Sequence, residues 1–298
     1  MKVINPVINE KRKSSDPFVT KYKGKYYSCF SDDRGVYVAE SESLAKLSES
    51  KEKAVCESGN SIAGVHWFAP ELHMIDGKWY IYGAPSDIEG YTTHTMSVLE
   101  SDGNDPMGEY SFRGMIRGLE NQWAIDGTVF ENDGKLYMIW SGNGGLMISE
   151  MSDPFTLTGK QTLITVPQYD WENRMSPVVE GPFVLKKDGY IHIVYSASDS
   201  RCDDYCLGLI TNKGGELLDA SSWNKLGKPI FSKTEGIYGP GHCSFTKHES
   251  DHGDIDVMVY HANTVSGTGW YGRSVWLQPI SWENGYPILG TPSIEVEL

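Results

Sequence analysis

Acidic residues stand at the start of three similar strand-like segments of the chain, at Asp16, Asp126 and Glu180. The same position is occupied by Ala69 and His242 in two further copies of the pattern. If the five positions converge in the fold, three carboxyl groups share one site, and each ionised group raises the pKa of its neighbours. Crowding of this kind keeps one carboxyl group protonated while another is ionised. These residues therefore predict a site for general acid–base chemistry.

One protonated and one ionised carboxyl group suit the hydrolysis of glycosidic bonds. The simpler alternative is a structural scaffold, in which each acid merely caps a turn at the start of a strand. Acids at equivalent positions in three of five copies favour the catalytic interpretation. Clustered like charges are costly, and they persist where a function requires them.

Five copies of a strand–turn–strand pattern position these residues and fill residues 10–265, with a period of about fifty to sixty residues. Three copies turn at Asp-Gly pairs, which favour two-residue hairpins because both residues adopt positive φ. These pairs are Asp76-Gly77, Asp133-Gly134 and Asp188-Gly189. Radial repetition of such units predicts an all-β fold, a five-bladed β-propeller. We expect residues 1–298 to form one catalytic domain, with Asn5-Pro-Val-Ile and the tail from Ser274 to Trp282 completing the last blade.

The composition limits the partners of the chain. It has 40 acidic and 26 basic residues and a net charge of −14, which disfavours binding to nucleic acid. No apolar run is long enough to span a bilayer, and the N-terminus lacks the apolar core of a signal peptide. We therefore expect no membrane partner and a cytoplasmic location, or a secreted or periplasmic one if a signal peptide has been removed. The five cysteines predict no disulfide framework, and whether Cys202 and Cys206 are bridged stays open.

Longer motifs surround the opening residues of the copies. Asp16-Pro17 is followed in order by Trp67-Phe-Ala-Pro-Glu71, Ile125-Asp-Gly-Thr-Val-Phe130, Val179-Glu-Gly-Pro-Phe-Val184 and Tyr238-Gly-Pro-Gly-His-Cys-Ser-Phe245. Together these segments cover all five copies, and they closely resemble glycoside hydrolase family 43. The resemblance implies a five-bladed propeller that hydrolyses α-L-arabinofuranosides, β-D-xylosides or arabinan with inversion of configuration.

The resemblance also implies a role for individual residues. Asp16 would act as general base on a water molecule, and Glu180 as general acid on the glycosidic oxygen. Asp126 would modulate the pKa of Glu180 and hold its orientation. His242 would lie beside a calcium or other cation in the central channel, with water between them, because a neutral imidazole is a poor direct ligand for calcium. Arg273 would reach a sugar hydroxyl.

Aromatic residues next to the opening positions are candidates for substrate binding. Trp67 and Phe68 precede the second copy, and Trp123 precedes Asp126. The C–H face of a sugar can stack on an aromatic ring, and loops at the strand openings should line the rim of a pocket. We therefore expect these three side chains to contact an oligosaccharide or polysaccharide that contains arabinose or xylose.

The choice of sugar leaves alternatives open. The lead-in Met175-Ser-Pro-Val-Val lacks the Trp- and Arg-rich sequence of many β-xylosidases of the family, and no C-terminal sandwich domain follows. Both features favour an exo-acting α-L-arabinofuranosidase on arabinan- or arabinoxylan-derived oligosaccharides, with insertions at residues 86–122 and 262–272 as walls of the site. A β-D-xylosidase or an endo-arabinanase is the alternative within the family. A non-catalytic carbohydrate-binding propeller would lose at least one acid, and a protein-binding scaffold would leave the acids unexplained.

Overall fold

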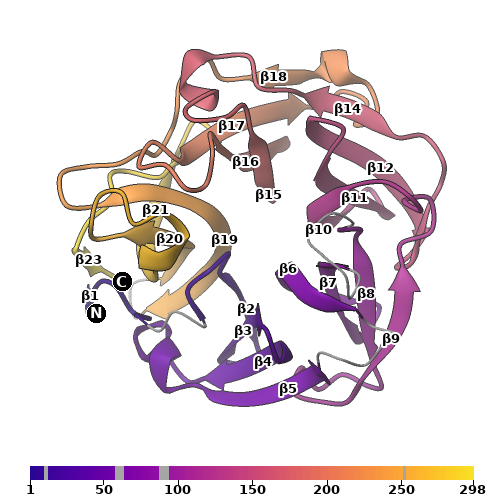
Figure 1. Cartoon of the computed structure of the whole chain (residues 1–298), viewed down its shortest axis with the longest axis horizontal. Helices are drawn as coiled ribbons and strands as arrows, with labels where there is room; N and C mark the ends of the chain where they lie inside the picture. Colours follow the sequence, from indigo (N-terminus) through magenta and orange to yellow (C-terminus); the bar gives the residue numbers. More distant parts are fainter. Residues whose placement is uncertain (10–12, 58–63, 87–93, 251–252) are drawn as a thin grey trace.

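Five antiparallel sheets form a ring around a central axis, so the predicted five-bladed β-propeller is confirmed (Figure 1). The structure, a computed structural model, describes residues 1–9, 13–57, 64–86, 94–250 and 253–298. Strands β2, β6, β10, β15 and β19 lie nearest the axis, and each begins one blade (Figure 1). The helices of this described part are short 3-10 turns, and none could cross a membrane.

Each blade runs from its inner strand outward in chain order. The first blade contains β2 (Phe18–Tyr22), β3 (Lys25–Asp32), β4 (Gly35–Ser41) and β5 (Lys51–Glu57). The second contains β6 (Val65–Ile75), β7 (Lys78–Ser86), β8 (Ser97–Ser101) and β9 (Tyr110–Met115). The third contains β10 (Ala124–Asn132), β11 (Lys135–Gly142), β12 (Gly145–Asp153), β13 (Thr156–Leu157) and β14 (Thr162–Thr165).

The last two blades follow the same order. The fourth contains β15 (Val179–Lys187), β16 (Tyr190–Ala197), β17 (Cys206–Lys213) and β18 (Trp223–Lys225). The fifth contains β19 (Tyr238–Ser250), β20 (Gly253–Asn263), β21 (Arg273–Glu283) and β22 (Tyr286–Ile288). Outside the blades lie 3-10 turns η2 (Leu44–Glu49), η3 (Asp170–Glu172), η4 (Ala220–Ser222) and η5 (Gly269–Gly272).

The predicted Asp-Gly turns join the first two strands of three blades. Asp133 and Gly134, for example, have φ angles of 51° and 73°, the left-handed conformation that this turn requires. The register Asn132↔Lys135 continues directly on both sides of the pair. The turns are therefore local in origin, which explains why they could be recognised from the sequence.

The start of each inner strand has a left-handed residue two positions before regular pairing begins. In four blades this residue is Asp16, Ala69, Asp126 or His242, as the repeat predicts. In the fourth blade it is Gly181, with φ of 53°, and pairing resumes at Phe183. The prediction that Glu180 stands at the equivalent position is therefore wrong by one residue. Its cause is physical: glycine adopts positive φ readily, so Gly181 takes this conformation in place of the acid that precedes it.

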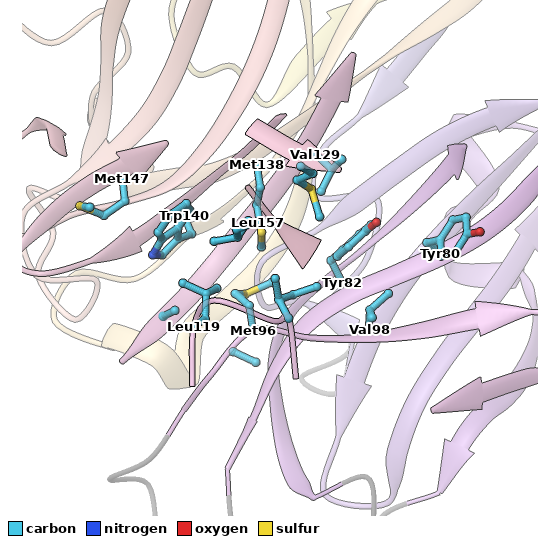
Figure 2. Close-up of a cluster of buried hydrophobic side chains, with 14 residues drawn as sticks. Tyr80, Tyr82, Met96, Val98, Leu119, Val129, Met138, Trp140, Met147 and Leu157 are labelled. Carbon is cyan, nitrogen blue, oxygen red and sulfur yellow. The ribbon is translucent and has the colours of Figure 1, made fainter. Parts of the chain in front are cut away.

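Hydrophobic clusters fill the spaces between blades and hold the inner strands in place. Figure 2 shows the cluster between the second and third blades, which includes Tyr82, Met96, Met138 and Trp140. A Cβ atom at Gly127 would lie only 2.4 Å from Met138 Cε and 2.7 Å from Met96 Cε. The glycine after Asp126 therefore lets the ends of these two methionine side chains pack directly against the inner strand that carries the acid.

The two ends of the chain meet beside the fifth blade. Strands β1 (Lys2–Ile4) and β23 (Glu295–Glu297) pair with each other, and Val7 N–H donates to the carbonyl of Val275. The tail from Ser274 to Trp282 lies within β21, the third strand of this blade. The expected association of the termini with the last blade is thus correct, but β1 and β23 form a separate pair rather than one of its strands. All five cysteines are free, so Cys202 and Cys206 are not bridged.

Candidate active site

The beginnings of the inner strands and the connections between second and third strands lie at the same end of the propeller. This follows from antiparallel pairing: the inner strand runs away from that end and the second strand returns to it. The arrangement brings Asp16, Asp126, Glu180 and His242 together. His242 Nδ1 lies 3.2 Å from Asp16 Oδ1, and Asp126 Oδ2 accepts a hydrogen bond from Gly181, the residue that follows Glu180. Each of the four consequently acts electrostatically on the pKa of another member of the group. The convergence predicted from the repeat is therefore present.

Asp16 is held by three basic side chains from the fifth blade. Its Oδ1 accepts a hydrogen bond from Arg273 Nη1 at 3.1 Å and lies 3.2 Å from His242 Nδ1. Its backbone N–H donates to His261 Nδ1 at 3.4 Å. No hydrogen bond among the described residues uses Oδ2 of this partly exposed carboxyl group. Asp16 is thus fixed through one oxygen and can offer the other to a water molecule.

Glu180 has the properties of a group that stays protonated near neutral pH. Burial and the neighbouring charge of Asp126 raise its pKa from 4.5 to about 7, although the Tyr205 hydroxyl opposes this rise. That hydroxyl donates to Oε1 at 2.8 Å, and no hydrogen bond within the described residues uses Oε2. Because Oε1 accepts from Tyr205, the proton of the neutral carboxyl group is directed to Oε2.

The space for Tyr205 is provided by a glycine. A Cβ atom at Gly241 would lie 2.3 Å from Tyr205 Cε1, a distance that a side chain cannot occupy. Burial raises the pKa of Tyr205 well above its ordinary value, so its hydroxyl remains a donor across the working pH range. The ring also stacks on His261, with centroids 5.6 Å apart and planes 6° apart. Tyr205 thus links Glu180 to the residues around Asp16.

Asp126 is the most buried member of the acidic trio. Burial raises its pKa from 3.8 to about 6, while the charge of His242 and a hydrogen bond from Gly181 N–H act in the opposite direction. That N–H donates to Asp126 Oδ2 at 3.1 Å. Gly181 directly follows Glu180, so Asp126 orients the backbone that carries Glu180 as well as acting on its charge.

His242 lies among all three carboxyl groups. Burial acts to lower its pKa, but Asp16, Asp126 and Glu180 act to raise it, and the net direction is upward. Its backbone N–H donates to Ser196 Oγ at 2.7 Å, which fixes it against the fourth blade. A positive imidazole here compensates part of the negative charge of the site.

The cation predicted beside His242 has no direct set of protein ligands in this geometry. Within the described ranges, no group of three or more His, Cys, Asp or Glu side chains could hold a metal ion. His242 directs Nδ1 toward Asp16. A cation held through water in the channel stays a prediction, and no catalytic step proposed below depends on it.

Sequence reasoning missed two residues of this cluster, His261 and Tyr205. His261 stands on β20 where other copies have a small residue, such as Ser196 in the fourth blade and Ala84 in the second. That departure from the repeat was a usable signal. Burial lowers the pKa of His261 well below its ordinary value, so it is neutral and accepts the Asp16 N–H. Tyr205 lies in a connection outside the repeated pattern, where the sequence offers no comparable signal.

The predicted aromatic residues separate into two groups. Phe68 stacks on His94 at a centroid distance of 3.7 Å, and Trp123, 45% exposed, meets the same imidazole edge-on at 5.3 Å. Trp67 is only 3% exposed and packs in the core, against Phe112 among others. The expected contact of Trp67 with a sugar is therefore wrong, because adjacent residues of a strand face opposite sides and the core takes this one.

The predicted walls of the site are only partly described. Residues 87–93, within the insertion 86–122, lie outside the described residues. The insertion 262–272 is described and ends at Arg273, whose side chain is 8% exposed and bonds Asp16. Contact of Arg273 with a sugar hydroxyl stays a prediction.

Comparisons with known proteins all point to relatives of one family. The sequence profile described as "Glycosyl hydrolases family 43" matches residues 3–287. The chain is 37% identical to "Extracellular exo-alpha-(1->5)-L-arabinofuranosidase" of Streptomyces chartreusis, with 87% of this chain and 81% of that protein covered. A protein of the same name from Streptomyces avermitilis is 32% identical, with 94% of this chain and 62% of that protein covered, so the chain spans less than two thirds of it. The crystal structure of α-L-arabinofuranosidase from Lactobacillus brevis is 32% identical, with a TM-score of 0.88 and coverage of 98% and 97%.

Proposed function

The chain belongs to glycosyl hydrolases family 43, and we propose that it is an exo-acting α-L-arabinofuranosidase that releases terminal arabinofuranosyl residues from arabinan- or arabinoxylan-derived oligosaccharides. Membership of the family makes it an inverting glycoside hydrolase with an oligosaccharide or polysaccharide as substrate. The names of the two Streptomyces relatives and of the Lactobacillus brevis structure support arabinofuranose as the sugar. The word "extracellular" in the two Streptomyces names favours the secreted location over the cytoplasmic one.

The observation that carries the proposal is the difference between Asp16 and Glu180. Glu180 has a pKa raised to about 7 by burial and by Asp126, so it can donate a proton near neutral pH. Asp16, by contrast, accepts a hydrogen bond from the guanidinium of Arg273 and lies 3.2 Å from His242 Nδ1, so its partners are basic groups rather than a second acid. Two carboxyl groups with opposite environments are what an acid–base pair for glycoside hydrolysis requires.

In the proposed reaction, Asp16 Oδ2 takes a proton from a water molecule while the water oxygen forms a bond to the anomeric carbon. The bond between that carbon and the glycosidic oxygen breaks, and its electron pair goes to the oxygen. Glu180 Oε2 supplies the proton that this oxygen needs. Attack from the side opposite the leaving group inverts the configuration of the anomeric carbon.

The surrounding residues support these two roles. Arg273 fixes Asp16 through Oδ1, and Tyr205 fixes Glu180 through Oε1. Asp126 keeps the proton on Glu180 by its negative charge. Phe68 and Trp123, arranged around His94, would contact the C–H faces of the sugar.

The test is product analysis with α-1,5-linked arabinotriose and with xylobiose as parallel substrates. We expect single arabinose units from arabinotriose and little hydrolysis of xylobiose. Proton NMR of the first-formed arabinose should show the β-anomer, because the linkage is α and the reaction inverts. Hydrolysis of xylobiose alone would overturn the choice of sugar, and a first-formed α-anomer would overturn the role proposed for Asp16.

A further inference from the structure

An exposed tryptophan stands at the same end of the propeller as the carboxyl cluster. Trp270 lies in η5, in the connection between the second and third strands of the fifth blade. These connections lie at the end where the inner strands begin, as argued above. The side chain is 53% exposed, and none of the candidate roles considered so far uses it.

The ring of Trp270 is nevertheless held in a defined orientation. Its Nε1–H donates to Ser200 Oγ at 2.9 Å, and the guanidinium of Arg201 lies over the ring, 5.5 Å from its centroid. Arg201 is in turn fixed by two hydrogen bonds to Asp199, at 2.8 and 2.6 Å. Asp199 also accepts from Ser176 Oγ at 2.7 Å. An exposed indole that is fixed on one face is well suited to stack a ligand on its accessible surface, because little conformational entropy remains to be lost.

The two segments that hold Trp270 also carry the partners of both catalytic candidates. The connection with Ser200 and Arg201 ends at Tyr205, which bonds Glu180. The segment with Trp270 ends at Arg273, which bonds Asp16. The segments touch each other, since a Cβ atom at Gly269 would lie 3.2 Å from the carbonyl oxygen of Arg201. Trp270 and the residues that hold it are therefore only a few residues along the chain from Arg273 and Tyr205, and each of these two residues donates a hydrogen bond to one of the carboxyl groups.

The position of the Trp270 ring indicates on which side of the scissile bond a ligand would contact it. Ser200 and Arg201 belong to the fourth blade, the blade that carries Glu180. A general acid lies next to the oxygen of the leaving group, so the leaving part of the substrate extends over the acid's side of the pocket. The cluster of Phe68, His94 and Trp123 comes from the second blade and the approach to the third, on a different part of the ring.

We propose that Trp270 is a stacking platform for a pentofuranosyl residue of the leaving group, so that the enzyme binds an oligosaccharide on both sides of the bond it cleaves. The ligand is neutral and presents C–H groups to the indole face, which is the chemistry that aromatic platforms recognise. The platform rests on the proposed function, because without glycoside hydrolysis there is no leaving group to bind.

The test compares Trp270→Ala with the unmodified enzyme on two substrates. Arabinotriose carries an arabinose-containing leaving group, whereas α-L-arabinofuranosyl fluoride has a leaving group too small to reach the platform. We expect the ratio of kcat/KM for arabinotriose to kcat/KM for the fluoride to fall about tenfold, which corresponds to about 1.4 kcal/mol. Trp270→Phe should recover most of the ratio. Tyr286→Ala, which removes a partly exposed ring from the outermost strand β22, is the matched control and should not change it.

The outcomes separate the platform from the proposed function. An unchanged ratio in Trp270→Ala, or an equal loss on both substrates, would overturn the platform while leaving the proposed function intact. Failure of the unmodified enzyme on both arabinose substrates would instead overturn the proposed function. A selective loss on arabinotriose that Trp270→Phe restores would establish the platform.

Discussion

Replacing Asp126 by Asn should move the basic limb of the pH–activity profile to lower pH. The side chain keeps its shape and an oxygen that can accept from Gly181 N–H, a bond of 3.1 Å in the structure, but it loses its charge. The charge of Asp126 is the second largest cause, after burial, of the raised pKa of Glu180. Without it, the pKa of Glu180 should fall from about 7 by about one pH unit, the smaller end of the range for a neighbouring charge.

The size of the effect depends on pH. At pH 7 the protonated fraction of Glu180 should fall from about one half to about one tenth, so kcat/KM should fall about fivefold from this cause. Below about pH 6 the difference should disappear, because the carboxyl group of Asp126, whose pKa is about 6, is then itself neutral in the unmodified enzyme. A loss that remains at low pH would measure the contribution of Asp126 to the orientation of Glu180.

The assay is kcat/KM for arabinotriose between about pH 5 and pH 9, because a sugar leaving group needs protonation by the general acid. Glu71→Gln is the matched control. Glu71 pairs with His73 at 2.7 Å and raises the pKa of Asp126, but it is not among the main causes of the raised pKa of Glu180. Its basic limb should stay near that of the unmodified enzyme. A basic limb that stays in place or moves upward in Asp126→Asn would refute the reasoning.

Two further changes test the environment of Glu180. Tyr205→Phe removes the hydrogen bond that lowers the pKa of Glu180, so the basic limb should move to higher pH, opposite to Asp126→Asn. The kcat for arabinotriose should also fall about tenfold, because Glu180 loses the group that orients it. Movement of the basic limb to lower pH would contradict the assignment. Glu180→Gln should abolish hydrolysis of arabinotriose but stabilise the fold above neutral pH. The folded-state pKa of Glu180, about 7, exceeds its ordinary value of 4.5, so the stability it contributes is present below pH 4.5 and lost as pH rises through 7. This difference in pKa corresponds to about 3 kcal/mol of unfolding free energy, which the partial exposure of Glu180 reduces to about 2 kcal/mol. The Tm of the variant should therefore exceed that of the unmodified enzyme by a few degrees at pH 8 and equal it at pH 4. An equal Tm change at both pH values would contradict this.

The propeller could be predicted from the sequence because its signals are local and repeated. Asp133-Gly134 forms the two-residue turn that its residues favour, and the same turn recurs in other blades. Each copy was therefore an independent test of the same interpretation. The separate pair of β1 and β23 could not be predicted in this way, because it joins the two ends of the chain and depends on how the ring closes.

The candidate site was predictable only where it followed the repeat. Asp16, Asp126 and His242 were found because they occupy one backbone position in their blades. Trp67 was misassigned because a tryptophan beside a strand opening can face either the pocket or the core, and strand alternation decides between them. Tyr205 was missed because its contact with Glu180 is set by tertiary packing. The role of residues 1–298 as one catalytic domain stays a prediction.

The offset of Glu180 by one residue from the position of the other acids explains how a symmetric fold produces an asymmetric site. In the third and fourth blades an acid precedes a glycine, so Asp126-Gly127 and Glu180-Gly181 look equivalent in sequence. The left-handed conformation falls on Asp126 in one blade and on Gly181 in the other. In the third blade Gly127 packs against the end of Met138, and the acid before it takes the left-handed position.

Glu180 consequently occupies the position before the left-handed residue, the position held by Phe68 in the second blade and by Gly241 in the fifth. In these three blades the same backbone position thus supplies an acid, an aromatic ring or an empty space. The space left by Gly241 in the fifth blade admits the ring of Tyr205, and the hydroxyl group of Tyr205 donates a hydrogen bond to Glu180 of the fourth blade. The chemical difference between Glu180 and Asp16 therefore follows from a shift of one residue in the backbone of a single blade, with the glycine of the next blade making room for the group that holds it.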